Sequence, residues 1–166
     1  METRIKLLGH PVHPMLIVYP LGLLSAAVIF DVLYVATGNG DLATFSFWAL
    51  AVGLVGGLLA AVFGLIDWLA IPRGTRARRV GLAHGGGNLI VVGLFALSFL
   101  LRTDGAQYLP DTLPFILGLL GGAIALVTAW LGGELVYRLR VAVDDDAGLD
   151  ASNSLSREGI VDVQTR

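Results

Sequence analysis

The sequence predicts an all-α integral membrane protein, a four-helix up-down bundle with both termini in the cytoplasm. Hydrophobic residues fill 55% of the 166 positions and charged residues only 14%, against about a quarter in soluble domains. Four apolar stretches, about residues 15–36, 45–71, 80–101 and 113–137, are each long enough to cross a bilayer, which takes roughly 20 residues. None alternates with period two, so a transmembrane barrel is disfavoured and helices remain.

The first stretch follows Arg4 and Lys6, as the core of a cleaved signal peptide would. Its apolar run continues through Val35, which is too long for a typical signal peptide. We therefore interpret it as a retained helix. Pro20 lies about one turn inside it and is expected to kink it.

The connections between the stretches are short, so consecutive helices should be antiparallel neighbours. Three groups of basic residues then fall on one side of the membrane: Arg4 and Lys6; Arg73, Arg76, Arg78 and Arg79; Arg138 and Arg140. The opposite side has only Arg102. By the positive-inside rule, the side that carries both termini is cytoplasmic.

The composition changes abruptly at Asp144, where three consecutive aspartates open a polar segment that reaches Arg166. It has few large apolar residues and no periodicity. We predict a transmembrane domain over residues 1–143 and a disordered acidic cytoplasmic tail over residues 144–166.

Polar side chains gather near one end of the four predicted helices. An ionisable residue in a membrane span costs roughly 2.5–3.5 kcal/mol at the helix centre and is a functional candidate by default. Because the helices alternate in direction, all of these residues fall within about two helical turns of one depth, at the cytoplasmic leaflet. They are His10, His13, Asp67, His84, Asn88 and Glu134.

The arrangement also suggests a duplicated hairpin. Asp67 follows His13 by 54 residues, and Glu134 follows His84 by 50. Two hairpins related by an axis along the membrane normal would give such a pattern.

Two kinds of metal site fit these residues. Imidazole with carboxylate suits a zinc, manganese or non-haem iron ion, held by His13, His84, Asp67 and Glu134 with His10 or Asn88 as a supporting or extra ligand. The alternative is haem b with His13 and His84 as axial ligands, where glycines 85–87 would leave room for the porphyrin. Arg138 or the basic loop of residues 73–79 would then pair with the propionates.

Each residue also has a purely structural interpretation. His10 and His13 would cap and kink a helix start with Pro14 in its first position. Asp67 and Glu134 would reach the headgroups and pair with Arg73 or Arg138. His84 would hydrogen-bond Asn88 one turn later, and Asp31 would pair with Arg102 at the outer end.

Four motifs together resemble a bacterial family of predicted membrane proteins, domain of unknown function 2231. They are Gly9-His10-Pro11-Val12-His13-Pro14-Met15-Leu16, Gly64-Leu65-Ile66-Asp67-Trp68, His84 with Asn88, and Gly132-Gly133-Glu134-Leu135-Val136-Tyr137. The resemblance implies a four-span protein of the bacterial plasma membrane, in some cases attached to or encoded near redox modules. This chain has Leu139-Arg140 where the family pattern carries His-Gly.

We expect a role in electron transfer or metal handling, with the lipid bilayer and a redox complex or a second copy as partners. Ion or proton translocation and a structural subunit without a cofactor are the alternatives. No hydrolase or phosphate-loop signature predicts an enzyme. No basic face with interleaved aromatic residues predicts nucleic-acid binding. The absence of cysteine excludes thiolate metal sites.

Overall fold

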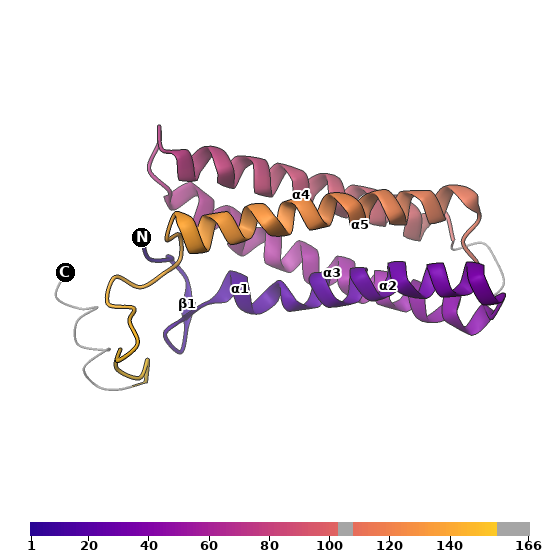
Figure 1. Ribbon diagram of the computed structural model, residues 1–166, viewed down its shortest axis with the longest axis horizontal. Coiled ribbons are helices and arrows are strands. Elements are labelled where there is room, and N and C mark those ends of the chain that lie inside the picture. The colour runs from indigo at the N-terminus through magenta and orange to yellow at the C-terminus, as the bar shows by residue number, and fades with distance from the viewer. Residues whose placement is uncertain (103–107, 156–166) are drawn as a thin grey trace.

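The computed structural model describes residues 1–102 and 108–155, and its helices form an elongated bundle (Figure 1). Among these residues, four helical segments are long and apolar enough to cross a membrane, which confirms the predicted all-α bundle of four membrane helices. The cytoplasmic location of both termini stays a prediction. The elements are β1 (Lys6–Leu7), β2 (His10–Pro11), α1 (Val12–Leu16), α2 (Val18–Thr37), α3 (Gly40–Ala70), α4 (Arg76–Leu100), α5 (Thr112–Gly133) and the π-helical turn η2 (Glu134–Arg138).

The bundle consists of two antiparallel hairpins. Helix α2 packs along α3, and α4 packs along α5, while α3 with α4 and α2 with α5 join one hairpin to the other. The N-terminal segment and the residues that follow η2 lie at the same end, at the left of Figure 1. This terminal end is the one that the basic residues predict to be cytoplasmic.

All four spans begin earlier than the apolar stretches predict, and α3 and α4 do so by the largest margins. Helix α3 starts at Gly40, where the Asn39 side chain accepts a hydrogen bond of 3.1 Å from the backbone N–H of Asp41. Helix α4 starts at Arg76, where Thr75 Oγ1 accepts from the N–H of Arg78 at 3.2 Å. These side chains satisfy amide groups that have no partner within the helix, so polar first turns precede the apolar stretches.

Pro20 breaks the first span, as predicted, by ending one helix and starting another. It has no N–H to donate to the carbonyl of Leu16, the residue four positions earlier. Helix α1 accordingly ends at Leu16 and α2 begins at Val18. The prediction that Pro14 occupies the first helical position is wrong, because α1 already begins at Val12.

Buried apolar residues form two clusters at different levels. The larger cluster lies away from the terminal end and comprises Leu24, Ala27, Ala49, Leu50, Leu54, Val91 and Phe95. The smaller one, at the terminal end, comprises Ile71, Leu135 and Val141. On α3 and α5 the residues between the two clusters include four that contact histidines: Ala60, Gly64, Thr128 and Gly132.

The two hairpins repeat the same contacts. Gly53 of α3 packs on Leu24 of α2, and Gly121 of α5 packs on Phe95 of α4. Phe95 follows Leu24 by 71 residues, and Gly121 follows Gly53 by 68. The hairpins are therefore structurally equivalent, with an offset of 71 between their first helices and 68 between their second helices.

A second pair of contacts has the same offsets with donor and acceptor exchanged. Ser46 Oγ donates to the carbonyl of Ala27, and Ser98 Oγ donates to the carbonyl of Pro114. In this register the equivalent of Asp67 is Leu135, one residue after Glu134. The pairing of Asp67 with Glu134 expected from the sequence is thus one residue out of register.

Candidate functional site

His13 is anchored to the neighbouring helix of its own hairpin. Its Nδ1 lies 2.8 Å from the carbonyl oxygen of Ala60 on α3. A carbonyl only accepts hydrogen bonds, so we assign the proton to Nδ1, which leaves the lone pair of the neutral ring on Nε2. Nε2 is therefore the atom of His13 that is available to bind a metal.

The imidazole reaches that carbonyl by lying against Gly64. A methyl group at position 64 would come within 2.8 Å of His13 Cε1 and 3.0 Å of Nδ1. In a helix the Cβ atoms lean toward the N-terminus, and so a side chain at position 64 would stand over the carbonyl one turn earlier. Glycine is what leaves that carbonyl open.

His84 repeats this arrangement in the second hairpin. Its Nδ1 lies 2.8 Å from the carbonyl oxygen of Thr128, and a methyl group at Gly132 would lie 3.1 Å from its Cε1. His84 follows His13 by 71 residues, and Thr128 and Gly132 follow their counterparts by 68. The two hairpins thus hold equivalent histidines with the same anchoring.

Asn88 distinguishes the two histidines. Its Nδ2 lies 3.2 Å from Nε2 of His84, the predicted contact one turn along α4. Its Oδ1 lies 2.8 Å from Thr128 Oγ1, whose single hydroxyl proton also has the carbonyl oxygen of Ala125 within reach, at 3.0 Å. The equivalent positions beside His13 are Ile17 and Ala60, which carry no polar side-chain group.

The two predicted carboxylate ligands have other partners. Asp67 is buried, and its Oδ1 accepts a hydrogen bond from Thr3 Oγ1 of the N-terminal segment. Glu134, in the turn η2, pairs with Arg76 at the start of α4 over 2.6 Å. The expected pairing of these carboxylates with Arg73 and Arg138 is therefore wrong.

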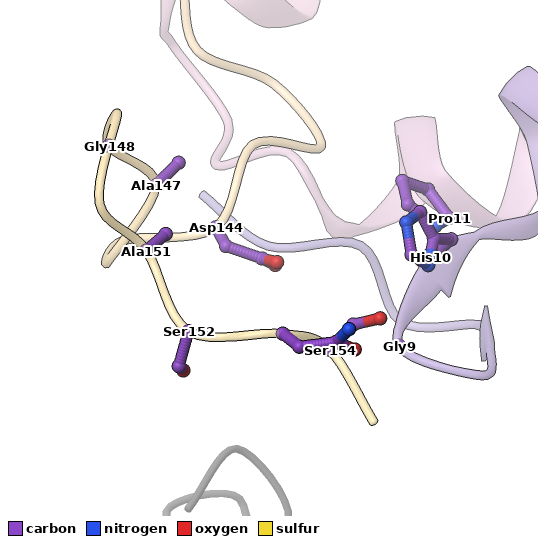
Figure 2. A pocket seen from close by; sticks show the side chains of 10 residues that line it. Gly9, His10, Pro11, Asp144, Ala147, Gly148, Ala151, Ser152 and Ser154 are labelled. Carbon is purple, nitrogen blue, oxygen red and sulfur yellow. The ribbon is translucent and has the colours of Figure 1, made fainter. Parts of the chain in front are cut away.

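His10 lies at the surface, away from the bundle interior. It begins β2, and its Nδ1 is 3.1 Å from the carbonyl of Leu8. With Gly9 it lines an open hollow whose other wall is the tail, including Asp144 and Ser154 (Figure 2). The described part of the predicted tail, residues 144–155, thus lies beside the N-terminal turn, and residues 156–166 are outside the described part.

Lys6 connects that tail to the N-terminal segment. Its Nζ lies 2.5 Å from Asp144 and 3.1 Å from Glu2. Partial burial lowers the pKa of Lys6, but the hydrogen bonds and charges of the two carboxylates outweigh this effect, so the pKa is raised above its usual 10.5. The ammonium group of Lys6 is therefore charged at physiological pH, and the ion pair is lost as the pH rises through that raised pKa.

Asp31 and Arg102 form a buried ion pair at the other end of the bundle, as predicted. The guanidinium makes two contacts with the carboxylate, of 2.8 and 2.6 Å, and also donates to Ser46 and Ser98. Arg102 follows Asp31 by 71 residues, so the pair joins equivalent positions of the two hairpins. The apolar cluster around Leu24 and Phe95 separates this pair from the histidines.

In residues 1–102 and 108–155, no group of three or more histidine, aspartate or glutamate side chains comes together as a metal site would require. The six predicted site residues therefore divide into the pair His13 and His84 with Asn88, and three residues engaged elsewhere. Sequence reasoning missed Ala60 and Thr128, and it named Gly64 and Gly132 only as parts of motifs, without their contacts to the histidines. Only the matched glycines, 68 residues apart, carry a signal in the sequence.

Comparison with known protein families matches residues 9–145 to the family described as Predicted membrane protein (DUF2231). Neither the curated proteins nor the solved structures give a match.

Proposed function

This chain belongs to the DUF2231 family of predicted membrane proteins, and on that premise we propose that it is an electron-transfer protein that binds haem b between His13 and His84. The observation that carries the proposal is the matched pair of imidazoles. Each donates Nδ1–H to a carbonyl and keeps the lone pair of Nε2 for a ligand. Histidines that bind metals are commonly oriented by a hydrogen bond of this kind from the other ring nitrogen.

The number of ligands favours haem over a non-haem ion. A porphyrin supplies four nitrogen donors, so its iron needs only two from the protein. A zinc or non-haem iron site needs three or four protein ligands, and Asp67 and Glu134 are engaged by Thr3 and Arg76. Two histidines from opposite hairpins meet the requirement of a haem.

The surroundings of the histidines also suit a flat apolar group. They lie at a level between the two apolar clusters. Beside His84, a methyl group at Gly86 would meet no atom within 4 Å, whereas Gly85 is exposed at the surface of the bundle and Gly87 packs on Thr128. Arg79 and Arg138, near the terminal ends of α4 and η2, would supply positive charge to the propionates.

Electron transfer follows from this ligand set. Two fixed imidazoles would hold the iron in the same coordination in both oxidation states, so little would rearrange when one electron is gained or lost. The apolar cluster around Leu24 and Phe95 separates this level from Asp31 and Arg102. Electrons would therefore be exchanged with a partner at the terminal end, and a continuous ion path is disfavoured.

The test is purification in mild detergent, followed by an absorption spectrum and metal analysis of one sample. We expect a Soret band and one iron per chain. His13→Ala should abolish the band, and His84→Ala should abolish or shift it, because each removes one axial ligand. His10→Ala is the matched control and should leave the band unchanged, since His10 lies at the surface hollow.

Stoichiometric zinc or manganese without a Soret band would contradict haem and favour the four-ligand ion site. A folded sample with neither a Soret band nor bound metal would contradict both the haem and the ion site. A structural subunit without a cofactor would then be the remaining function.

A further inference from the structure

The N-terminal hairpin turns through two residues of left-handed backbone, and one of them is a leucine. Strands β1 and β2 pair antiparallel with Leu7 opposite His10, which leaves Leu8 and Gly9 as the turn. Their φ angles are 51° and 81°. Such turns favour asparagine, aspartate or glycine, and a leucine is disfavoured there by its Cβ. The local backbone therefore gives no reason for a leucine at position 8.

Packing within the chain gives no reason either. Leu8 is 70% exposed, and the neighbouring Leu7 is 53% exposed. Both precede the first membrane-spanning helix, so they are not among the leucines that face lipid along the spans. Two adjacent exposed leucines at a disfavoured turn indicate contact with a partner outside this chain.

The position of the hairpin identifies that partner. Helix α1, which opens the first membrane span, begins at Val12, directly after β2. In Figure 1 the hairpin turns away from the long axis of the bundle, which is the axis that crosses the membrane. The tip is thus held beside the helices at the level where the span enters the bilayer. Lipid headgroups lie at this level.

The charges around the tip fit an anionic membrane surface. Arg4 is exposed, and its guanidinium makes no hydrogen bond or ion pair within residues 1–102 and 108–155. Lys6, by contrast, is engaged by Glu2 and Asp144. In the tail, Leu149 is exposed as well, but it follows three aspartates, which an anionic surface repels. The free positive charge therefore lies with the leucines of the hairpin.

We propose that the tip of this hairpin is a membrane-surface anchor that binds anionic phospholipid. Leu7 and Leu8 insert between the headgroups, and the guanidinium of Arg4 pairs with a lipid phosphate. Guanidinium groups bind phosphate oxygens through two parallel hydrogen bonds, and a basic residue near an anionic leaflet adds attraction to it. The anchor fixes the level at which the first span enters the bilayer. It involves no cofactor and is independent of the histidine pair.

A nitroxide spin label tests this insertion, and the absence of cysteine from the chain makes the labelling specific. The protein with Leu8→Cys is labelled and reconstituted into vesicles of phosphatidylcholine and anionic phosphatidylglycerol, with a water-soluble nickel chelate on both sides. We expect the label to collide more with oxygen, which concentrates in lipid, than with the chelate. Leu149→Cys is the matched control, an exposed leucine among acidic residues, and should show the reverse.

Two further changes test the separate parts of the anchor. Leu8→Asn suits the left-handed turn better than leucine does, and it should shift a label at Leu7→Cys from lipid toward water. Arg4→Gln should lower the ratio of lipid-embedded to water-exposed label at position 8 about fivefold, the factor that one basic residue near an anionic surface contributes. In vesicles of phosphatidylcholine alone, Arg4→Gln should have no effect.

A label at position 8 that is as open to the nickel chelate as the label at position 149 overturns the anchor. An unchanged label at position 7 after Leu8→Asn also overturns it, because the tip would then need only a well-formed turn. The same loss from Arg4→Gln in neutral and anionic vesicles, or no loss in either, overturns the assignment of anionic lipid. None of these outcomes affects the Soret band, so the proposed function is tested separately.

Discussion

Gly64 and Gly132 decide whether the histidines can reach their carbonyls. Neither glycine lies at a positive φ, so backbone freedom is not the reason for them. The reason is space, because a methyl group would collide with an imidazole at 2.8 Å in one hairpin and meet it at 3.1 Å in the other. The glycines are thus part of the site rather than of general helix packing.

Gly64→Ala is therefore expected to displace His13 and to weaken haem binding while the fold persists. Alanine favours a helix over glycine by about 1 kcal/mol, so stability should not fall for backbone reasons. Haem content and the melting temperature in detergent measure the two effects separately. Gly93→Ala is the control, since its methyl group would meet nothing within 4 Å and Gly93 is not part of the proposed haem site. A Gly64→Ala protein with full haem content would show that His13 does not need this anchor.

The sequence predicted part of the site for an identifiable reason. His13, His84 and Asn88 stand out because they are polar residues at the ends of apolar stretches. Their partners Ala60 and Thr128 act through backbone carbonyls, which have no side-chain signature. Asp67 and Glu134 share only their depth with the histidines, and depth does not say which way a side chain points around its helix.

At the scale of helices, the buried ion pair fastens the second half of α2 to the end of α4. Asp31 and Arg102 have side chains only 4% and 0% exposed. Gly118 of α5 lies beside them, where a methyl group would be 3.7 Å from the carboxylate. The pair thus joins the two hairpins at the end opposite the histidines.

Asp31→Asn should destabilise the protein by about 3–5 kcal/mol, because it leaves the Arg102 charge buried without a counter-charge. The double change Asp31→Leu with Arg102→Met removes both charges and is expected to be close to neutral. The melting temperatures of the wild type, Asp31→Asn and the double variant in detergent measure these differences in stability. Equal melting temperatures for Asp31→Asn and the wild type would mean that water or lipid already neutralises Arg102.

Helix ends were predicted less well than helices. The apolar stretches identify the spans, since a run of about 20 apolar residues is typical of a membrane helix. The starts of α3 and α4 lie in polar turns capped by Asn39 and Thr75, outside any hydropathy signal. The break at Ile17 follows from Pro20 and was expected as a kink.

At the scale of the whole molecule, the basic residues predict that the histidine end faces the cytoplasm. The chain has no cysteine, so a single introduced cysteine can report on its side of the membrane. Thr37→Cys, at the end of α2, should react with a membrane-impermeant maleimide in intact cells. Ser152→Cys, in the tail, should react only after the membrane is permeabilised. The reverse pattern would place the two histidines at the outer leaflet.

The ion pair of Asp31 and Arg102 has a consequence for how such a protein can arise. In a symmetric dimer of identical hairpins, residues on the two-fold axis face their own copies, so aspartate would oppose aspartate. A single chain that contains both hairpins is free of that constraint and can mutate each half separately. At one end of the bundle, equivalent positions carry opposite charges. At the other end, an asparagine lies beside only one of the two histidines. Two identical hairpins could have neither difference.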